Sequence, residues 1–289
     1  MTRTVVGMAF GGVLTLTSAV GSAHCEAPDT TRRVQGDTIM AVAPGASRDD
    51  SLGVHWVQVQ ANGLGTLSAA VALPRGNGPF PAIVILHGSH GFGREYIDLA
   101  RTFARGGFVA IAGCWFSGRK GAGTSFITPI ECPDAPSLSA ASSDTAYQAV
   151  EALMRAACEQ PQVRPDRVAL FGHSRGGGAA LQYVLKGGVV QALILNSAGY
   201  PEEVVEQAAH ITAPTLLLHG TADSPADGGS AMTSVERAHL FEAAMRRAGR
   251  SVESKYYRNG RHNGIFQSTP QREDELKRST LFLRRHLAL

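Results

Sequence analysis

The chain has 289 residues, of which 44% are hydrophobic and 18% are charged, and its formal net charge is +3. This length suits one large domain or two small ones, and the composition is globular rather than disordered. The densest basic pairs, Arg246-Arg247 and Arg284-Arg285, fall near the ends of predicted helices, where cations are favourable. Because the other basic residues are scattered, we expect no nucleic-acid partner.

Residues 1–23 have the pattern of a secretory signal peptide. Arg3 supplies the positive start, Val5–Val20 is apolar, and small residues at Gly21-Ser22-Ala23 predict cleavage after Ala23. A membrane anchor is the alternative interpretation. However, Gly and Thr interrupt the run, which is shorter than the roughly 20 strongly apolar residues of a span. We therefore expect a secreted or periplasmic protein with no stable membrane anchor.

The rest of the chain is predicted to be a weakly ordered lead-in over 24–51 and one domain over 52–289. Apolar segments around a Gly-rich turn, Val54–Gln60 and Leu67–Leu73, predict an antiparallel hairpin. Continuous apolar runs then predict strands that are buried on both faces. These runs are Ala82–Leu86, Phe108–Ala112, Val168–Phe171, Ala192–Leu195 and Thr215–Leu218, with Ser254–Tyr257 as a weaker candidate.

Helices are predicted between these strands, so that strand and helix alternate along the chain. The predicted helices are Glu95–Arg105, Ser139–Cys158, Gly176–Leu185 and Val235–Ala248, with a final helix opening at Thr269-Pro270. Thr233 and Glu236 are expected to form a capping box before the fourth of them, and Gly249 to end it. Such alternation predicts a mostly parallel sheet with helices on both faces.

Four cysteines are present, and an exported protein can join them in disulfides. The sequence alone does not give the connectivity. Cys114 and Cys132 flank one irregular segment, so we favour a bond between them over free thiols. Cys25 and Cys158 stay unassigned. Because the sequence has neither a CxxC motif nor a Cys/His cluster, we expect no metal site.

The sharpest motif is the G-x-S-x-G of Gly172 to Gly176, which follows a predicted strand and opens a predicted helix. This is the context of a nucleophile elbow, in which a strained turn projects the serine hydroxyl at the carboxyl end of a sheet. We therefore predict Ser174 as a nucleophile, against the alternative of a glycine-rich turn with an incidental serine. The neighbouring His173 is expected to pack or orient rather than to act as the base.

A serine hydroxyl needs a base and an acid, which follow the nucleophile along the chain in this kind of site. Asp223 leaves the strand predicted over Thr215–Leu218 and is the predicted acid, with Asp227 in the same loop as the fallback. His262 lies in a loop between the last strand and the final helix and is the predicted base. The alternative is that they are solvated loop residues.

Two backbone N–H groups are needed to bind the oxyanion of the reaction. We expect one from Arg175, directly after the nucleophile, and one from the loop His87–Gly91 after an early strand. Ser89 is the preferred residue of that loop, and His90 is the second choice.

These motifs resemble the dienelactone hydrolase-like branch of the α/β-hydrolase superfamily from about Val54 to the C-terminus. The resemblance rests on HGSHG, GHSRGG, LLLHGTAD and GRHNG, at His87–Gly91, Gly172–Gly177, Leu216–Asp223 and Gly260–Gly264. It implies the α/β-hydrolase fold, with a mostly parallel sheet of about eight strands. True dienelactone hydrolases carry cysteine at the position of Ser174. The resemblance therefore favours a serine esterase, similar to secreted lipase-like and polyester-hydrolase-like members.

Two segments bear on the substrate. The chain between Asn196 and Thr215 is too short for a large cap, so we predict an open cleft. The long loop from Gly113 to Pro136 carries Trp115, Phe116 and Phe126, which either bind an acyl or aryl group or pack the loop. We list Trp115, Phe116 and His90 as candidate substrate contacts.

The predicted activity is hydrolysis of a small-molecule or polymeric carboxylic ester through an acyl-enzyme, without a cofactor. The alternatives are a peptidase of the prolyl-oligopeptidase type, an acyltransferase, and a binding protein that lacks catalysis. The sequence leaves the ester and the oligomeric state open.

Overall fold

The computed structural model describes residues 54–118, 125–142 and 144–288. The predicted signal peptide and the lead-in lie outside these residues and stay predictions. Cys25 also lies outside them. In the part of the chain that is described, no helix combines the length and apolar character needed to cross a membrane.

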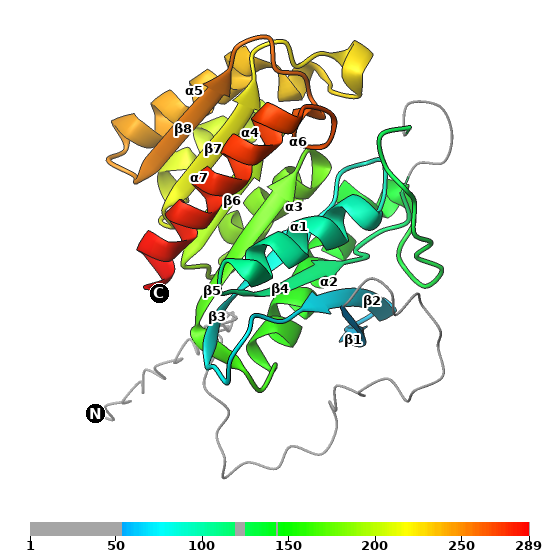
Figure 1. Ribbon diagram of the computed structural model, residues 1–289. Helices are drawn as coiled ribbons and strands as arrows, with labels where there is room; N and C mark the ends of the chain where they lie inside the picture. Colours follow the sequence, from blue (N-terminus) through cyan, green and yellow to red (C-terminus); the bar gives the residue numbers. More distant parts are fainter. Residues whose placement is uncertain (1–53, 119–124, 143, 289) are drawn as a thin grey trace, which may run out of the picture.

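The strands that the apolar runs predicted are present. They are β1 (His55–Ala61), β2 (Gly65–Ala72), β3 (Phe80–Leu86), β4 (Val109–Gly113), β5 (Val163–His173), β6 (Ala192–Asn196), β7 (Thr215–Gly220) and β8 (Val252–Tyr257). They form one sheet in the order β1-β2-β4-β3-β5-β6-β7-β8 (Figure 1). β1 with β2 and β2 with β4 pair antiparallel, and every other pair is parallel.

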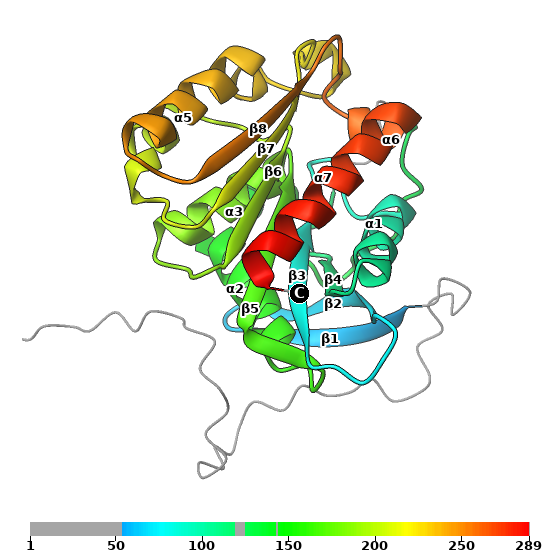
Figure 2. The same ribbon diagram turned by 60° about the vertical axis from the view of Figure 1, so that its left-hand side comes forward.

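Helices cover both faces of this sheet (Figure 2). The helices α1 (Arg94–Arg105) and α7 (Thr269–Leu287) pack on one face, and α2 (Asp144–Cys158), α3 (Arg175–Leu185) and α5 (Val235–Arg247) pack on the other. Along β3, Val84 joins one core cluster whereas Ile83 and Ile85 join the other. The run is apolar throughout because each face of the strand is buried. The predicted α/β-hydrolase fold is confirmed.

One predicted helix and one predicted helix cap differ from the structure. The helix predicted over Ser139–Cys158 is divided into a 3-10 turn at Leu138–Ser142 and α2. The predicted capping box before α5 is wrong, because Ser234 is the N-cap and accepts a hydrogen bond from Arg237 N. Thr233 instead ends the preceding 3-10 helix, and its hydroxyl donates to Asp223. The short-range pattern could not reveal this competing long-range partner.

Only small elements lie between β6 and β7, as the length of that segment predicts. They are the five-residue helix α4 (Glu202–Glu206) and the 3-10 turn Ala208–His210. The described residues therefore contain no large cap between these strands. The favoured disulfide is also confirmed, since Cys114 and Cys132 are bonded with their Cα atoms 5.8 Å apart. Cys158 is disulfide-bonded as well.

Candidate active site

Ser174 lies between the last residue of β5 and the first residue of α3. Its backbone has φ 53° and ψ −116°, a region that residues with a side chain rarely adopt. Its N–H donates to the carbonyl of Asn196 at the end of β6 at 2.9 Å. Such strain persists only where the surrounding structure imposes it, and it is characteristic of a nucleophile elbow.

The two glycines of the motif are required by close backbone contact. A Cβ on Gly172 would overlap the carbonyl of Gly176 and lie 2.5 Å from the Cα of Gly177. A Cβ on Gly176 would overlap the carbonyl of Leu86 at the end of β3 and lie 2.8 Å from that of His87. The G-x-S-x-G spacing therefore lets α3 begin directly against the sheet.

We expect Gly176→Ala to lower the free energy of unfolding by about 1–3 kcal/mol, because the added methyl meets backbone that cannot move aside. Gly178→Ala is the matched control. It lies on the same helix with no atom within 4 Å of an added Cβ, so it should stabilise the protein by about 0.5–1 kcal/mol. Urea denaturation of both variants measures the difference, and equal midpoints would contradict the packing argument.

The structure brings Ser174, His262 and Asp223 together from three different loops. His262 Nε2 lies 2.8 Å from Ser174 Oγ, and His262 Nδ1 lies 2.7 Å from Asp223 Oδ2. Ser174 is 6% exposed and His262 is 2% exposed. With a proton on Nδ1 that is donated to the carboxylate, Nε2 is left to accept the serine proton.

Asp223 is held by more than His262. Its Oδ1 accepts from the Thr233 hydroxyl at 3.0 Å, and His219 Nε2 lies 3.3 Å from its Oδ2. Burial favours the neutral acid, but hydrogen bonds from His219 and His262 outweigh it and hold the pKa of Asp223 below its ordinary value. The carboxylate is therefore charged at neutral pH and faces the imidazole.

The fallback acid, Asp227, is engaged elsewhere. Its carboxylate pairs with Arg261 at 3.0 Å, and its carbonyl accepts from Asn263 Nδ2 at 2.7 Å. Of the two aspartates in this loop, it is Asp223 that the structure places against the His262 ring.

The loop after β3 lies against the nucleophile, as expected for a source of oxyanion donors. A Cβ added to Gly88 would lie 3.2 Å from Ser174 Cβ and 3.0 Å from His173 Cδ2. Ser89 is the next residue, and Arg175 opens α3 beside Ser174. Both predicted donors therefore belong to segments that border the serine, and their role stays a proposal.

The candidate substrate contacts divide into two groups. Trp115 and Phe116 are 1% and 0% exposed, and Trp115 Nε1 donates to the carbonyl of His87 at 3.0 Å. Of the two interpretations that the sequence left open for these residues, the structure favours packing. His90 is only partly buried, with its Nε2 2.8 Å from the hydroxyl of Tyr96 and its ring 5.0 Å from that of Phe126. It stays a candidate contact.

Sequence reasoning missed Phe266, which lies in the short helix α6 (Gly264–Gln267). Its ring centroid is 5.1 Å from that of His173, 5.8 Å from His90 and 5.8 Å from Phe126. An aromatic residue four positions after the predicted base was the available signal. Thr233, Asn196 and Asn263 were also missed, because their contacts join segments that are distant in sequence.

Among the described residues, no group of three His, Cys, Asp or Glu side chains is arranged to hold a metal ion. A strained serine after a parallel strand, bonded to a histidine that is bonded to an aspartate, is the arrangement of α/β-hydrolases. The profile of the Dienelactone hydrolase family matches residues 67–285, and the chain belongs to that family. It is a hydrolase-family protein of the α/β-hydrolase fold.

Individual relatives are distant. The chain is 27% identical over 137 residues to an uncharacterized peptidase, YtmA, of Bacillus subtilis, covering 36% of this chain and 51% of the relative. The match therefore spans about half the length of that curated relative.

Solved structures share the fold at low identity. A putative dienelactone hydrolase of Klebsiella pneumoniae has a TM-score of 0.62 and 18% identity, covering 80% of this chain and 98% of that one. The Pyrococcus furiosus esterase Pf2001 has a TM-score of 0.62 and 15% identity, covering 89% of this chain and 100% of that one.

Proposed function

We propose that the protein is a serine hydrolase that cleaves carboxylic esters, with Ser174, His262 and Asp223 as its catalytic triad. The observation that carries the proposal is the continuous hydrogen-bonded chain from Ser174 Oγ through both His262 nitrogens to Asp223 Oδ2. A serine hydroxyl is a weak nucleophile until a base accepts its proton. The hydrogen bonds from Ser174 to Asp223 place His262 as that base and orient its ring.

In the first half of the reaction, Ser174 Oγ attacks the ester carbonyl carbon while His262 Nε2 takes the hydroxyl proton. The backbone N–H groups of Arg175 and Ser89 stabilise the resulting oxyanion. The intermediate collapses, the alkoxide leaves with the proton from His262, and an acyl group stays on Ser174. In the second half, His262 removes a proton from water, which attacks the acyl carbon. His262 then returns that proton to Ser174 Oγ as the acyl–oxygen bond breaks and the acid leaves.

Asp223 has two roles in these steps. Its carboxylate fixes the His262 proton on Nδ1, so that Nε2 is free to act as the base. It also stabilises the imidazolium that forms when Nε2 takes the serine proton. The hydrogen bonds from His219 and His262 keep the carboxylate charged, and the Thr233 hydroxyl, which donates to Oδ1, helps to orient it.

Ester cleavage is the favoured reaction for two reasons. A serine stands where true dienelactone hydrolases carry cysteine, and the fold match to the Pyrococcus furiosus esterase covers 89% of this chain and 100% of that one. Peptide cleavage is the second candidate, since the curated relative is described as a peptidase. The turnover of matched ester and anilide substrates with the same acyl group separates the two.

Secretion or a periplasmic location is also proposed. The pattern of residues 1–23 and the Cys114–Cys132 bond both suit an oxidising compartment. The proposed partner is a small-molecule or polymeric ester, without nucleic acid or a stable membrane anchor.

A fluorophosphonate probe tests the proposed nucleophile. We expect the wild type to be labelled at Ser174, and Ser174→Ala to be unlabelled and inactive towards p-nitrophenyl esters. Label on another residue, or undiminished turnover in Ser174→Ala, would rule out the assignment. A series of p-nitrophenyl esters of graded acyl length, with soluble polyesters, then defines the acyl group.

A further inference from the structure

A buried carboxyl group lies behind the proposed triad, on the helix that follows the His262 loop. Glu275 is on α7, and its side chain is 0% exposed. Its Oε1 accepts from Gln271 Nε2 and its Oε2 from Asn196 Nδ2, each at 2.9 Å. No step of the proposed reaction uses this group. A carboxyl group buried at such a cost calls for an explanation beyond packing.

Hydrogen bonds connect Glu275 to the loop of the catalytic base. The Asn196 amide that donates to Glu275 presents its Oδ1 to His173 Nδ1 at 2.6 Å. The other nitrogen of His173, Nε2, lies 3.2 Å from Asn263 Oδ1. Asn263 is adjacent to His262, and His173 is adjacent to Ser174. The imidazole of His173 therefore bridges β6 and the His262 loop directly behind the nucleophile.

Along this path there are fewer hydrogen-bond donors than acceptors. Burial lowers the pKa of His173 to about 3, so the ring is neutral and carries one N–H. Both of its nitrogens face amide oxygens, so only one of the two contacts is a hydrogen bond. Asn263 cannot turn its amide to help, because its Nδ2 already donates to the carbonyl of Asp227. The longer contact, to Asn263, is the one left without a proton.

Protonation of Glu275 removes this mismatch. A neutral carboxyl group can donate its O–H to Asn196 Oδ1 once that amide turns over, and Asn196 Nδ2 then donates to His173 Nδ1. The single proton of His173 moves to Nε2 and is donated to Asn263. Each polar group then has a partner, which favours this form in a buried site.

We propose that Glu275 is a positioning residue whose protonated form, acting through Asn196 and His173, holds the His262 loop in its catalytic geometry. The inference rests on the proposed function and adds a control of the same site by pH. Ionisation of Glu275 commits the amide of Asn196 to the carboxylate. It thereby removes the hydrogen bond between His173 and Asn263, which is one of the contacts that hold the His262 loop.

The surroundings of Glu275 allow its carboxyl group to ionise at neutral to alkaline pH. Burial raises the pKa of Glu275 to about 8, and the hydrogen bonds from Gln271 and Asn196 oppose the rise. Asp274 on α7 and Tyr257 on β8 interact electrostatically with Glu275. Arg278 on α7 and Lys255 on β8 interact with Asp274 in turn, and His173 on β5 is connected to Glu275 through Asn196. Asp274 is itself bonded to Tyr257 and Arg278, at 2.9 and 2.6 Å.

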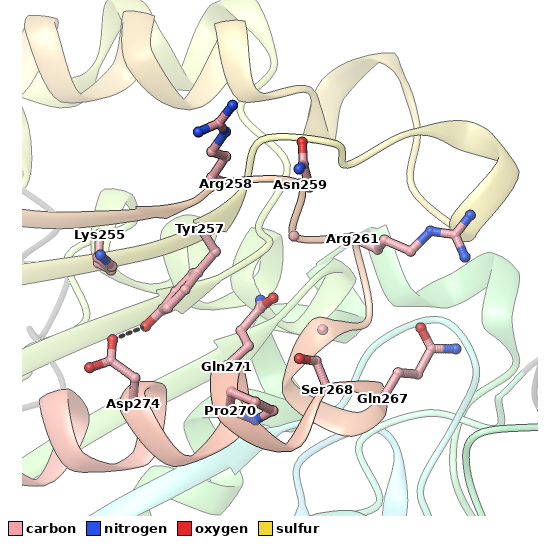
Figure 3. A pocket seen from close by; sticks show the side chains of 12 residues that line it. Lys255, Tyr257, Arg258, Asn259, Arg261, Gln267, Ser268, Pro270, Gln271 and Asp274 are labelled. Carbon is pink, nitrogen blue, oxygen red and sulfur yellow. Dashed lines mark hydrogen bonds between the residues drawn. The ribbon is translucent and has the colours of Figure 1, made fainter.

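A cavity lies next to a hydrogen-bond partner of this buried carboxyl. Gln271, which is hydrogen-bonded to Glu275, lines a cavity of about 730 Å³ between β8, the His262 loop and the start of α7 (Figure 3). In Figure 3, the Gln271 side chain rises from α7 towards the loop that carries Asn259 and Arg261. The hydrogen bond from Gln271 therefore links Glu275 to the lining of this cavity.

The direct test is the tautomer of His173, read from imidazole ¹⁵N shifts between pH 6 and 10, with His173→Gln used to assign the signals. We expect a change from the Nε2–H form to the Nδ1–H form with a midpoint near pH 8. Glu275→Gln should keep one tautomer throughout. A His173 tautomer that is constant in the wild type, or that changes equally in Glu275→Gln, would overturn the proposal. This measurement requires no turnover.

The second test is the pH profile of Ser174 labelling and of kcat/KM. We expect both rates in the wild type to fall about three- to tenfold between pH 7 and 9.5 relative to Glu275→Gln, the factor of one neutral hydrogen bond. Glu253→Gln, which removes an exposed carboxylate on β8, is the matched control and should follow the wild type. If Ser174 is labelled but the wild type and Glu275→Gln have identical pH profiles, the positioning role is overturned and the proposed function stands. Absence of labelling overturns the proposed function.

Discussion

Replacement of His262 by alanine is expected to lower kcat for an ester substrate by about 10⁵- to 10⁶-fold, with a much smaller change in KM. The imidazole is the only group placed between Ser174 Oγ and Asp223 in the described structure, at 2.8 and 2.7 Å. Without it, the serine proton has no acceptor in the transition state, whereas substrate contacts are retained. Steady-state kinetics with a p-nitrophenyl ester measure the effect.

Two comparisons make this expectation specific. The Ser174→Ala/His262→Ala double variant should be no less active than either single variant, because the two groups act as a unit. His239→Ala is the matched control, since His239 lies on α5 with its ring 4.0 Å from that of Tyr256. It should retain nearly full activity. Losses that add in the double variant, or more than a tenth of the activity left in His262→Ala, would show that another residue is the base.

The sequence was sufficient to predict that Ser174, Asp223 and His262 would meet. Each follows a predicted strand of a mostly parallel sheet, and the carboxyl ends of parallel strands lie at one edge. The G-x-S-x-G motif added a local constraint, because its glycines meet the backbone of α3 and β3. Regular geometry therefore turned three distant positions into one site.

The polar partners of the site could not be predicted in the same way. The sequence pattern predicted that Thr233 caps a helix, whereas its hydroxyl donates a hydrogen bond to Asp223. Glu275 lies in a helix with Asp274 and Arg278, a pattern typical of a solvated face, yet it is buried. Its burial depends on how α7 is rotated against β6. The hydrogen-bond partner, Asn196, is 79 positions away.

The role of the aromatic residues in the loop after β4 could not be predicted from the sequence either. Trp115 and Phe116 follow the end of β4, close in sequence to the edge where the site forms, and composition alone left contact and packing open. The structure buries both against His87, whose ring lies 4.6 Å from that of Phe116. Whether an aromatic residue of this loop is buried or partly exposed is decided by the path of the loop, which the residue types do not specify.

Replacement of Asp223 by asparagine is expected to lower kcat by about 10⁴-fold while the protein stays folded. The amide removes the negative charge that stabilises the imidazolium of His262, and an Nδ2–H₂ group facing Nδ1 favours the wrong tautomer. The pKa of Asp223 is held below its ordinary value, so the wild-type carboxylate is ionised at neutral pH and this charge is what the variant loses. Kinetics at pH 7, with a thermal melt as the folding check, measure the effect.

Asp227→Asn is the control that separates the two aspartates of this loop. Its side chain is 11% exposed and contacts Arg261, whose side chain is 65% exposed, and a pair with one solvated partner contributes little. The group that Asp227 offers to the site is its carbonyl, which accepts from Asn263 and which the substitution leaves in place. We therefore expect Asp227→Asn to change kcat less than about threefold, the factor expected for loss of one ion pair with a solvated partner. A larger loss in Asp227→Asn than in Asp223→Asn would reverse the assignment of the acid, because it is the Asp223 carboxylate that lies 2.7 Å from His262 Nδ1.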